Sequence, residues 1–224
     1  MNILGRALVL ALVAAAPAAA DDQRTITVSG ASSLTIANDT AGFVTGVTAR
    51  RSSPGAALRS ASAATSRVLH ALEAAGVAAG DLRTDDVAVH AVRRHHLVLY
   101  VASEAVHVVV RNVTSTGAVI DAAVRAGATR MSGLTFWRSR SADVYRQALV
   151  AALRNARAKA QALAQDSNAT LGEVVSIDES GVESYPLDSA GAGTAAPAPK
   201  VPTRPGRTKV TATLTAVYAL TSAA

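Results

Sequence analysis

Histidine is the residue type in this chain best suited to hold a metal ion or to move a proton near neutral pH, and five histidines are present. His95 and His96 are adjacent, so on a strand their side chains would point to opposite faces, although a turn could bend both inward. His90 and His107 would face each other only in a hairpin that places the apolar residues Leu97–Tyr100 in its turn, which is unfavourable. We therefore expect no metal site.

The sequence offers no arrangement of residues typical of a hydrolase or a nucleotide-binding enzyme. Gly30–Leu34 contains serines but lacks the second glycine of a nucleophile elbow. Gly191–Gly193 is not followed by the Gly-Lys-Ser/Thr of a phosphate-binding loop. The chain has no cysteine, which excludes thiol nucleophiles, thiolate metal sites and iron–sulfur clusters. We expect no catalytic residue, no cofactor and no enzymatic activity.

Two pairs of arginines, Arg50 with Arg51 and Arg93 with Arg94, are candidate anion-binding residues, because guanidinium groups pair well with carboxylates and phosphates. The net charge of +6 would also attract the chain to nucleic acid or to an anionic surface. The arginines are scattered, however, and outnumber the lysines 19 to 3, which GC-rich codon usage also explains. Because no run of five like charges is present, we expect no nucleic-acid partner.

Residues 1–20 have the composition of a signal peptide. Arg6 supplies a positive charge, Ala7–Ala16 is an unbroken apolar run, and Ala18–Ala20 offers a cleavage site of small residues. The apolar run is shorter than the about 20 residues that span a bilayer, and no later segment reaches that length without charges. We therefore predict cleavage after Ala20 and a periplasmic mature chain without a transmembrane segment.

The periodicity of apolar residues predicts an α+β domain over residues 21–224. From Asp39 to Arg138 the predicted order is strand-helix-strand-strand-helix-strand, the split β-α-β arrangement of ferredoxin-like folds, and a further helix and two strands extend it. We expect a mainly antiparallel sheet with helices on one face. The predicted strands are Arg24–Gly30, Asp39–Ala49, Asp86–Val92, Leu97–Arg111, Arg130–Arg138, Thr170–Glu179 and Thr208–Leu220. The predicted helices start at about Pro54, Thr116 and Ala142.

The two strands on either side of residues 93–96 are predicted to form a hairpin. A tight turn through Arg94 and His95 would place His90 opposite Leu99. In the second of these strands, alternate valines are expected to face the same side: Val106, Val108 and Val110.

Each of the longer helices has an apolar stripe expected to face the sheet. The stripe of the first comprises Leu58, Ala61, Thr65, Val68 and Leu72, and Gly76 is predicted to end this helix. Ser141 is the predicted cap of the longest helix, whose stripe comprises Tyr145, Leu149, Ala152, Ala156, Ala160 and Leu163. Alanines in this stripe should let the helix backbone lie close to the sheet.

Residues 184–207 are rich in Pro, Ala and Gly and predict an extended mobile loop before the last strand. The strand that follows, residues 208–220, alternates apolar residues with threonines. This alternation is typical of an antiparallel strand with one buried and one solvated side.

Four groups of segments, in this order along the chain, together resemble the SIMPL-domain family of YggE-like periplasmic proteins. They are Ile26–Gly30 with Asp39–Ala41; Tyr100–Ser103 with Val106–Arg111; Tyr145–Leu149 with Ala156–Ala164 and Leu171–Val174; and Pro205–Gly206 with Val210–Leu220. The connection between Val92 and Leu97 looks shorter than in the family. The resemblance implies an exported domain linked to envelope or oxidative stress, with ring-like or channel-like oligomers in some members. It supplies no catalytic residues.

Two hypotheses of function follow. The first is a non-enzymatic envelope protein that forms a homo-oligomer and contributes to stress tolerance. The alternative is a periplasmic binding module that contacts an anionic envelope ligand or surface through the arginine-rich turns at Arg50, Arg51, Arg93 and Arg94. Assembly that is insensitive to salt would favour the first hypothesis, and salt-sensitive binding to anionic lipid the second.

Overall fold

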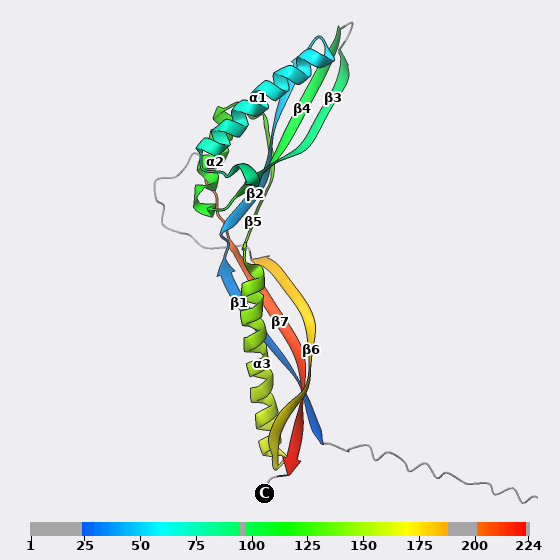
Figure 1. Cartoon of the computed structure of the whole chain (residues 1–224), viewed down its shortest axis with the longest axis vertical. Coiled ribbons are helices and arrows are strands. Elements are labelled where there is room, and N and C mark those ends of the chain that lie inside the picture. Colours follow the sequence, from blue (N-terminus) through cyan, green and yellow to red (C-terminus); the bar gives the residue numbers. More distant parts are fainter. Residues whose placement is uncertain (1–23, 95–96, 188–200, 223–224) are drawn as a thin grey trace, which may run out of the picture.

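The computed structural model describes residues 24–94, 97–187 and 201–222, which form two lobes arranged end to end (Figure 1). Each lobe contains one antiparallel sheet with helices on one side. The expected α+β class with mainly antiparallel strands is therefore confirmed. The molecule is elongated because one sheet lies beyond the other rather than against its face.

The first lobe has the split β-α-β topology predicted from the sequence. Its elements are β2 (Thr40–Arg51), α1 (Pro54–Ala74), β3 (Leu82–Arg94), β4 (Leu97–Val110), α2 (Thr116–Arg125) and β5 (Arg130–Trp137). The strand order is β3-β4-β2-β5. Helix α1 thus carries the chain from β2 past β4 to β3, and α2 carries it from β4 past β2 to β5.

The last two strands were predicted to extend that sheet, but they form a second sheet with the first strand of the chain, and the long helix packs on this second sheet. The elements of this lobe are β1 (Thr25–Ala37), α3 (Ser141–Asp166), β6 (Ala169–Leu187) and β7 (Arg207–Ser222). Their order is β1-β7-β6, so the last strand lies in the middle, between the first strand and β6. The predicted alternation of β7 is confirmed, since its alternate apolar residues are buried: Val210, Ala212, Leu214, Ala216 and Tyr218.

Helix α1 begins and ends at the residues that the sequence indicates. Ser53 Oγ accepts a hydrogen bond from the backbone N–H of Ala56 at 3.3 Å, and Pro54 occupies the first helical position, where its missing N–H costs nothing. Just beyond the helix end, Gly76 has a φ of +92°, a conformation that glycine adopts more readily than other residues.

The core of the first lobe lies between its sheet and the two shorter helices. The predicted row of β4 valines faces it, together with Phe43 of β2. One residue predicted to be buried is not: Leu58 of α1 is 37% exposed. In α1 the buried stripe instead passes through Ala57, which packs with Ala61 on small side chains of β2 and β4. Short side chains at this end let the helix lie close to the sheet, and Leu58 is then turned outward.

The core of the second lobe is a row of alanines on α3, each four residues from the last. These are Ala148, Ala152, Ala156, Ala160 and Ala164, and all are fully or almost fully buried. Tyr145 and Leu149 are only partly buried at the margin of this cluster, and Leu163 is 51% exposed, so the predicted stripe was placed too far toward its larger residues. Ser141 is the first helical residue rather than the cap, which is Arg140.

The register of the hairpin formed by β3 and β4 differs from the predicted one. Arg94 lies opposite Leu97, so His90 lies opposite Val101 and not opposite Leu99, because the turn is one residue further along than predicted.

The predicted signal peptide lies outside the described residues. Of the predicted loop 184–207, residues 184–187 belong to β6, residues 188–200 lie outside the described residues, and Arg207 begins β7.

Candidate functional site

The first sheet separates the four arginines that the sequence suggested for anion binding. Arg50 and Arg51 end β2 and Arg93 and Arg94 end β3, with β4 between the two strands. Arg50 and Arg51 leave the sheet on opposite faces, as successive strand residues do. Arg51 points to the helical side, where it contacts Ser60 of α1. The two pairs therefore do not form one site; the side chain of Arg94 lies outside the described residues.

Arg50 and Arg51 share a hollow with Arg67, an arginine that the sequence analysis did not single out. This hollow, of about 360 Å³, lies where the end of β2 meets α1 and the residues before β5. We call it the arginine hollow; its polar lining is Thr48, Arg50, Arg51, Ser60, Arg67 and Thr129, and its apolar lining includes Val47, Ala49 and Ala64. Ser60, Ala64 and Arg67 have the i, i+4, i+7 spacing of one helix face, and this was the signal available in the sequence.

Hydrogen bonds hold two of these guanidinium groups in place. Arg51 Nη1 donates to the carbonyl oxygen of Arg50 at 2.7 Å, and Arg51 Nη2 donates to Ser60 Oγ at 2.7 Å. Arg67 Nη1 donates to the carbonyl oxygen of Ala63 at 3.1 Å. Both arginines are thus oriented before any ligand binds. Most of the five N–H groups of each guanidinium are not used in these hydrogen bonds.

The arginine hollow has a positive lining. No aspartate or glutamate is among its lining residues. The ion pairs of the described residues join other groups: His70–Glu73, Arg111–Asp81, Arg138–Asp39 and Arg146–Asp143. Glu104 lies opposite Val47 in the sheet but is hydrogen-bonded to Ser62 beneath α1. The lining residues are suited to holding an anion.

Two other hollows are less suited to holding an anion. One of about 330 Å³ on the sheet face away from the helices is lined by Arg50 and His90 over the apolar side chains of Val92, Leu99 and Val101. Another, of about 630 Å³, is lined by residues of α3 alone and includes the Asp143–Arg146 ion pair, so it is a stretch of helix surface.

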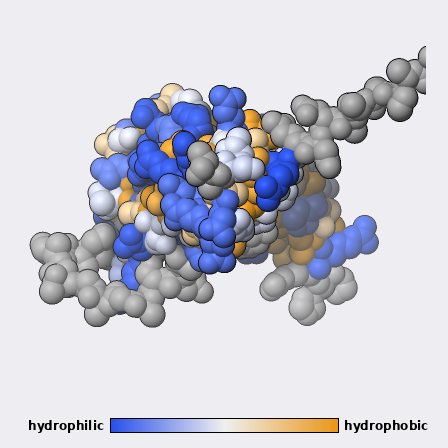
Figure 2. Space-filling model, turned by 90° about the horizontal axis from the view of Figure 1, so that it is seen from below, coloured by the Kyte–Doolittle hydropathy of each residue, from blue (hydrophilic) through white to orange (hydrophobic). Residues whose placement is uncertain are grey.

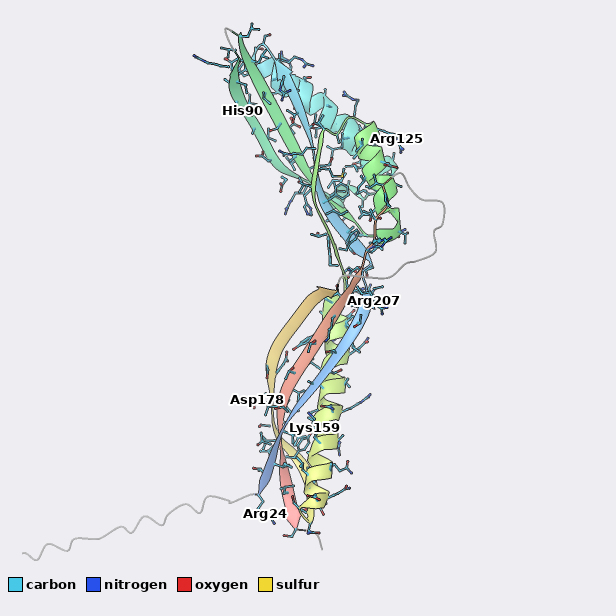
Figure 3. The ribbon with its side chains drawn as sticks, turned by 180° about the vertical axis from the view of Figure 1, so that it is seen from behind. Arg24, His90, Arg125, Lys159, Asp178 and Arg207 are labelled. Atoms are coloured by element: carbon cyan, nitrogen blue, oxygen red, sulfur yellow. The ribbon has the colours of Figure 1, made fainter. Side chains whose placement is uncertain are left out.

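The three histidines in the described part of the chain, His70, His90 and His107, are dispersed over the first lobe. His90 lies on β3 opposite Val101, and Figure 3 shows it away from the helices. His107 lies opposite Arg83, several residues from His90 along the hairpin. His95 and His96 lie outside the described residues. Within residues 24–94, 97–187 and 201–222, no three His, Cys, Asp or Glu side chains are grouped so that they could hold a metal ion.

Asp39 joins the two lobes where β1 passes into β2. It accepts hydrogen bonds from the backbone N–H and the hydroxyl of Ser139 at 2.8 and 2.9 Å, and from the Thr40 hydroxyl at 2.9 Å, and it pairs with Arg138 at 3.2 Å. Burial alone would raise the pKa of Asp39, but the hydrogen bonds from Ser139 and Thr40 and the charge of Arg138 outweigh it and hold the pKa below its ordinary value.

Neighbouring Asn38 ties the segment before β7 to the same junction. Its Nδ2 donates to the carbonyl oxygen of Pro205 at 2.7 Å, and its Oδ1 accepts from the hydroxyl of Thr208 at 2.6 Å. Three stretches of chain that cross between the lobes are therefore fixed to one another by side chains.

Two other side chains with shifted pKa values, Tyr145 and Arg111, form hydrogen bonds that support the fold. The hydrogen bond to Glu179, together with burial and the charge of Glu179, raises the pKa of Tyr145 to about 12, so the phenol stays protonated at neutral pH. The hydrogen bonds and charge of Asp81 raise the pKa of Arg111, which grips that carboxylate through two contacts of 2.7 and 2.6 Å.

The sequence matches the model of a known protein family. The model of the SIMPL family, described as a protein of unknown function (DUF541), matches residues 26–218. The chain belongs to the SIMPL family. This confirms the resemblance seen in the sequence, and the match extends from β1 to β7, so it includes both lobes and all residues of the arginine hollow. A search of the curated proteins found no match for this SIMPL protein.

In the described part of the chain, no helix of the SIMPL protein is both long enough and apolar enough to cross a bilayer.

Proposed function

We propose that this SIMPL protein is an exported, non-enzymatic envelope protein that self-assembles and contributes to envelope or oxidative stress tolerance. The composition of residues 1–20 supports export to the periplasm. The family resemblance is the support for a link to stress. Self-assembly is supported by the surface of the second lobe.

The observation that carries self-assembly is an exposed apolar edge strand. Strand β6 lies at one edge of the second sheet, and three of its apolar residues are about half exposed: Val174 at 46%, Val175 at 52% and Ile177 at 47%. An edge strand presents unpaired N–H and C=O groups, and apolar side chains beside them favour contact with another chain. Viewed from the end of the second lobe, apolar side chains reach the surface among hydrophilic ones (Figure 2).

The opposite edge of the same sheet, strand β1, is capped by side chains of α3. Lys159 Nζ donates to the carbonyl oxygen of Ser29 at 2.9 Å, and Asn155 Oδ1 accepts from the N–H of Ala31 at 3.4 Å. Lys159 lies alongside the sheet in Figure 3. Since charged and polar side chains over an edge discourage strand pairing, β6 is the edge of the second sheet left for assembly.

The solution mass of the mature chain, residues 21–224, tests this function. We expect a mass several times that of one chain, unchanged between 50 mM and 1 M NaCl, because contacts between apolar side chains are not screened by salt. A mass of one chain at all concentrations would contradict the proposal.

A second candidate function is a binding module for an anionic envelope ligand. The arginine hollow favours it, since three arginines line a concave surface without an acidic residue. This function does not exclude the first, because the hollow is in the first lobe and the exposed part of β6 is in the second.

A further inference from the structure

We propose that the arginine hollow binds the phosphate group of a phosphorylated ligand, with Arg51, Arg67 and Ser60 as its principal contacts. The inference rests on the second candidate function, an anion-binding module, and names the site and the chemical class of its ligand.

The first argument is the orientation of the donors. Arg51 is held at both ends of its guanidinium group, by the carbonyl oxygen of Arg50 and by Ser60 Oγ. Because Ser60 Oγ accepts that hydrogen bond, its own O–H remains able to donate to a ligand. Arg67, seven residues further along α1, is held by the carbonyl oxygen of Ala63. A ligand therefore meets donors whose conformational freedom is already reduced, which lowers the entropic cost of binding.

The second argument is an interrupted sheet edge. Strand β5 pairs with β2 only as far as Gly46, so the last residues of β2 have no strand partner on this side. Thr129 takes the next position: its N–H donates to the carbonyl oxygen of Gly46 at 2.8 Å, and its Oγ1 accepts from the N–H of Thr48 at 2.9 Å. In an antiparallel strand every second residue directs its N–H to the same side, so the N–H of Arg50 points toward the hollow and adds a backbone donor.

The third argument is charge and number of donors. Two guanidinium groups, those of Arg51 and Arg67, the hydroxyl of Ser60 and the N–H of Arg50 line a hollow of about 360 Å³ whose lining contains no carboxylate. A carboxylate has two oxygens and one negative charge, whereas a phosphate monoester offers three charged oxygens and up to two charges, and it uses several guanidinium groups at once. The donor set thus fits a phosphate group better than a carboxylate, and the volume leaves room for the group to which the phosphate is attached.

Calorimetric titration of the mature chain with inorganic phosphate, at constant ionic strength set with NaCl, tests the site. We expect saturable binding of one phosphate per chain that is weakened about tenfold or more in each of Arg51→Gln and Arg67→Gln. Arg93→Gln is the matched control, because it removes the same charge from an exposed strand position outside the hollow. It should change the affinity less than twofold. Equal loss in all three variants would show attraction to net charge alone and would overturn the site.

Flotation with vesicles containing phosphatidic acid identifies the source of the phosphate. If the ligand is a lipid headgroup, vesicles bind the wild type, and both inorganic phosphate and Arg67→Gln release the protein from them. If it is a soluble phosphorylated molecule, inorganic phosphate binds but the vesicles do not. Vesicle binding that ignores inorganic phosphate and survives Arg67→Gln would overturn the site but leave an anion-binding module elsewhere. Failure to bind either inorganic phosphate or the vesicles would overturn both the phosphate site and the second candidate function.

Discussion

Gly30 of β1 lies directly against the backbone of Ala152 in α3. A Cβ atom placed on Gly30 would lie 2.1 Å from the carbonyl oxygen of Ala152 and 2.8 Å from the Cβ of Ala156. Helix and strand are therefore in backbone contact at this point, which requires a glycine on one side and alanines on the other. The same approach brings Asn155 and Lys159 over the edge of β1, so the packing of the core and the protection of the edge have one cause.

We expect Gly30→Ala to lower the free energy of unfolding by about 1–3 kcal/mol, because the added methyl group forces α3 away from the sheet. The measurement is urea unfolding followed by circular dichroism. Gly80→Ala is the control, since nothing lies within 4 Å of the position of its Cβ. If both variants unfolded at the wild-type urea concentration, α3 would not be packed on β1 as described.

The sequence predicted the elements well but not which sheet they join. The alternation of β7 and the caps of α1 are local patterns, and both are confirmed. That β1 pairs with β7, across most of the chain, depends on long-range packing that no local pattern reveals. The predicted stripe of α3 is wrong for a related reason: the periodicity favours burial of large residues such as Leu163, whereas contact with Gly30 selects the alanine row.

Gly42 provides a second close contact, with the single tryptophan. Its Cβ position is 2.8 Å from the Cη2 and Cζ3 atoms of Trp137. Gly42→Ala should displace the indole ring into water and shift its fluorescence emission to longer wavelength, with a loss of about 1–3 kcal/mol in stability. Gly55→Ala, which meets only the side chain of Arg59, should leave the emission unchanged. Unchanged emission in Gly42→Ala would place Trp137 elsewhere.

Asp39 should make the stability of the junction depend on pH. Its folded-state pKa lies below the ordinary value of 3.8, so its contribution is fully present above pH 3.8 and is lost as the pH falls through the folded-state pKa. At pH 7 we expect Asp39→Asn to lower the free energy of unfolding by about 1–2 kcal/mol, because the hydrogen bonds to Ser139 weaken and the ion pair with Arg138 is lost. Urea unfolding at pH 7 and near pH 2.5 should show this difference shrinking with acidity; a constant difference would mean that the charge of Asp39 has no role.

Truncation after Gly206 should prevent the second lobe from folding. It removes the central strand of the sheet, with its six buried apolar residues, and leaves β1 without its strand partner. Removal of residues 223–224 alone is the control and should have no effect on melting temperature. A chain ending at Gly206 that stayed soluble and melted within a few degrees of the full mature chain would contradict the central position of β7.

The candidate site was predicted in part. Arg50 and Arg51 were chosen because adjacent arginines suggest anion binding, and both line the arginine hollow. Arg67 is not part of an arginine pair in the sequence, and one arginine on a helix is ordinarily a solvated side chain. Only the return of α1 over the end of β2 brings it to the same hollow as Arg51. Arg93 was chosen on the same grounds as Arg50, but the register of the hairpin places it beyond the hollow.

Self-assembly through β6 is tested most directly by the solution mass of two variants with the same change of charge. Val175 of β6 and Val150 of α3 are almost equally exposed, at 52% and 51%. Val175→Asp places a charge on the edge proposed for assembly, whereas Val150→Asp places one on the outer surface of α3. With both variants folded by circular dichroism, light scattering should give a reduced mass for Val175→Asp and the wild-type mass for Val150→Asp. An unreduced mass for Val175→Asp would contradict assembly through this strand.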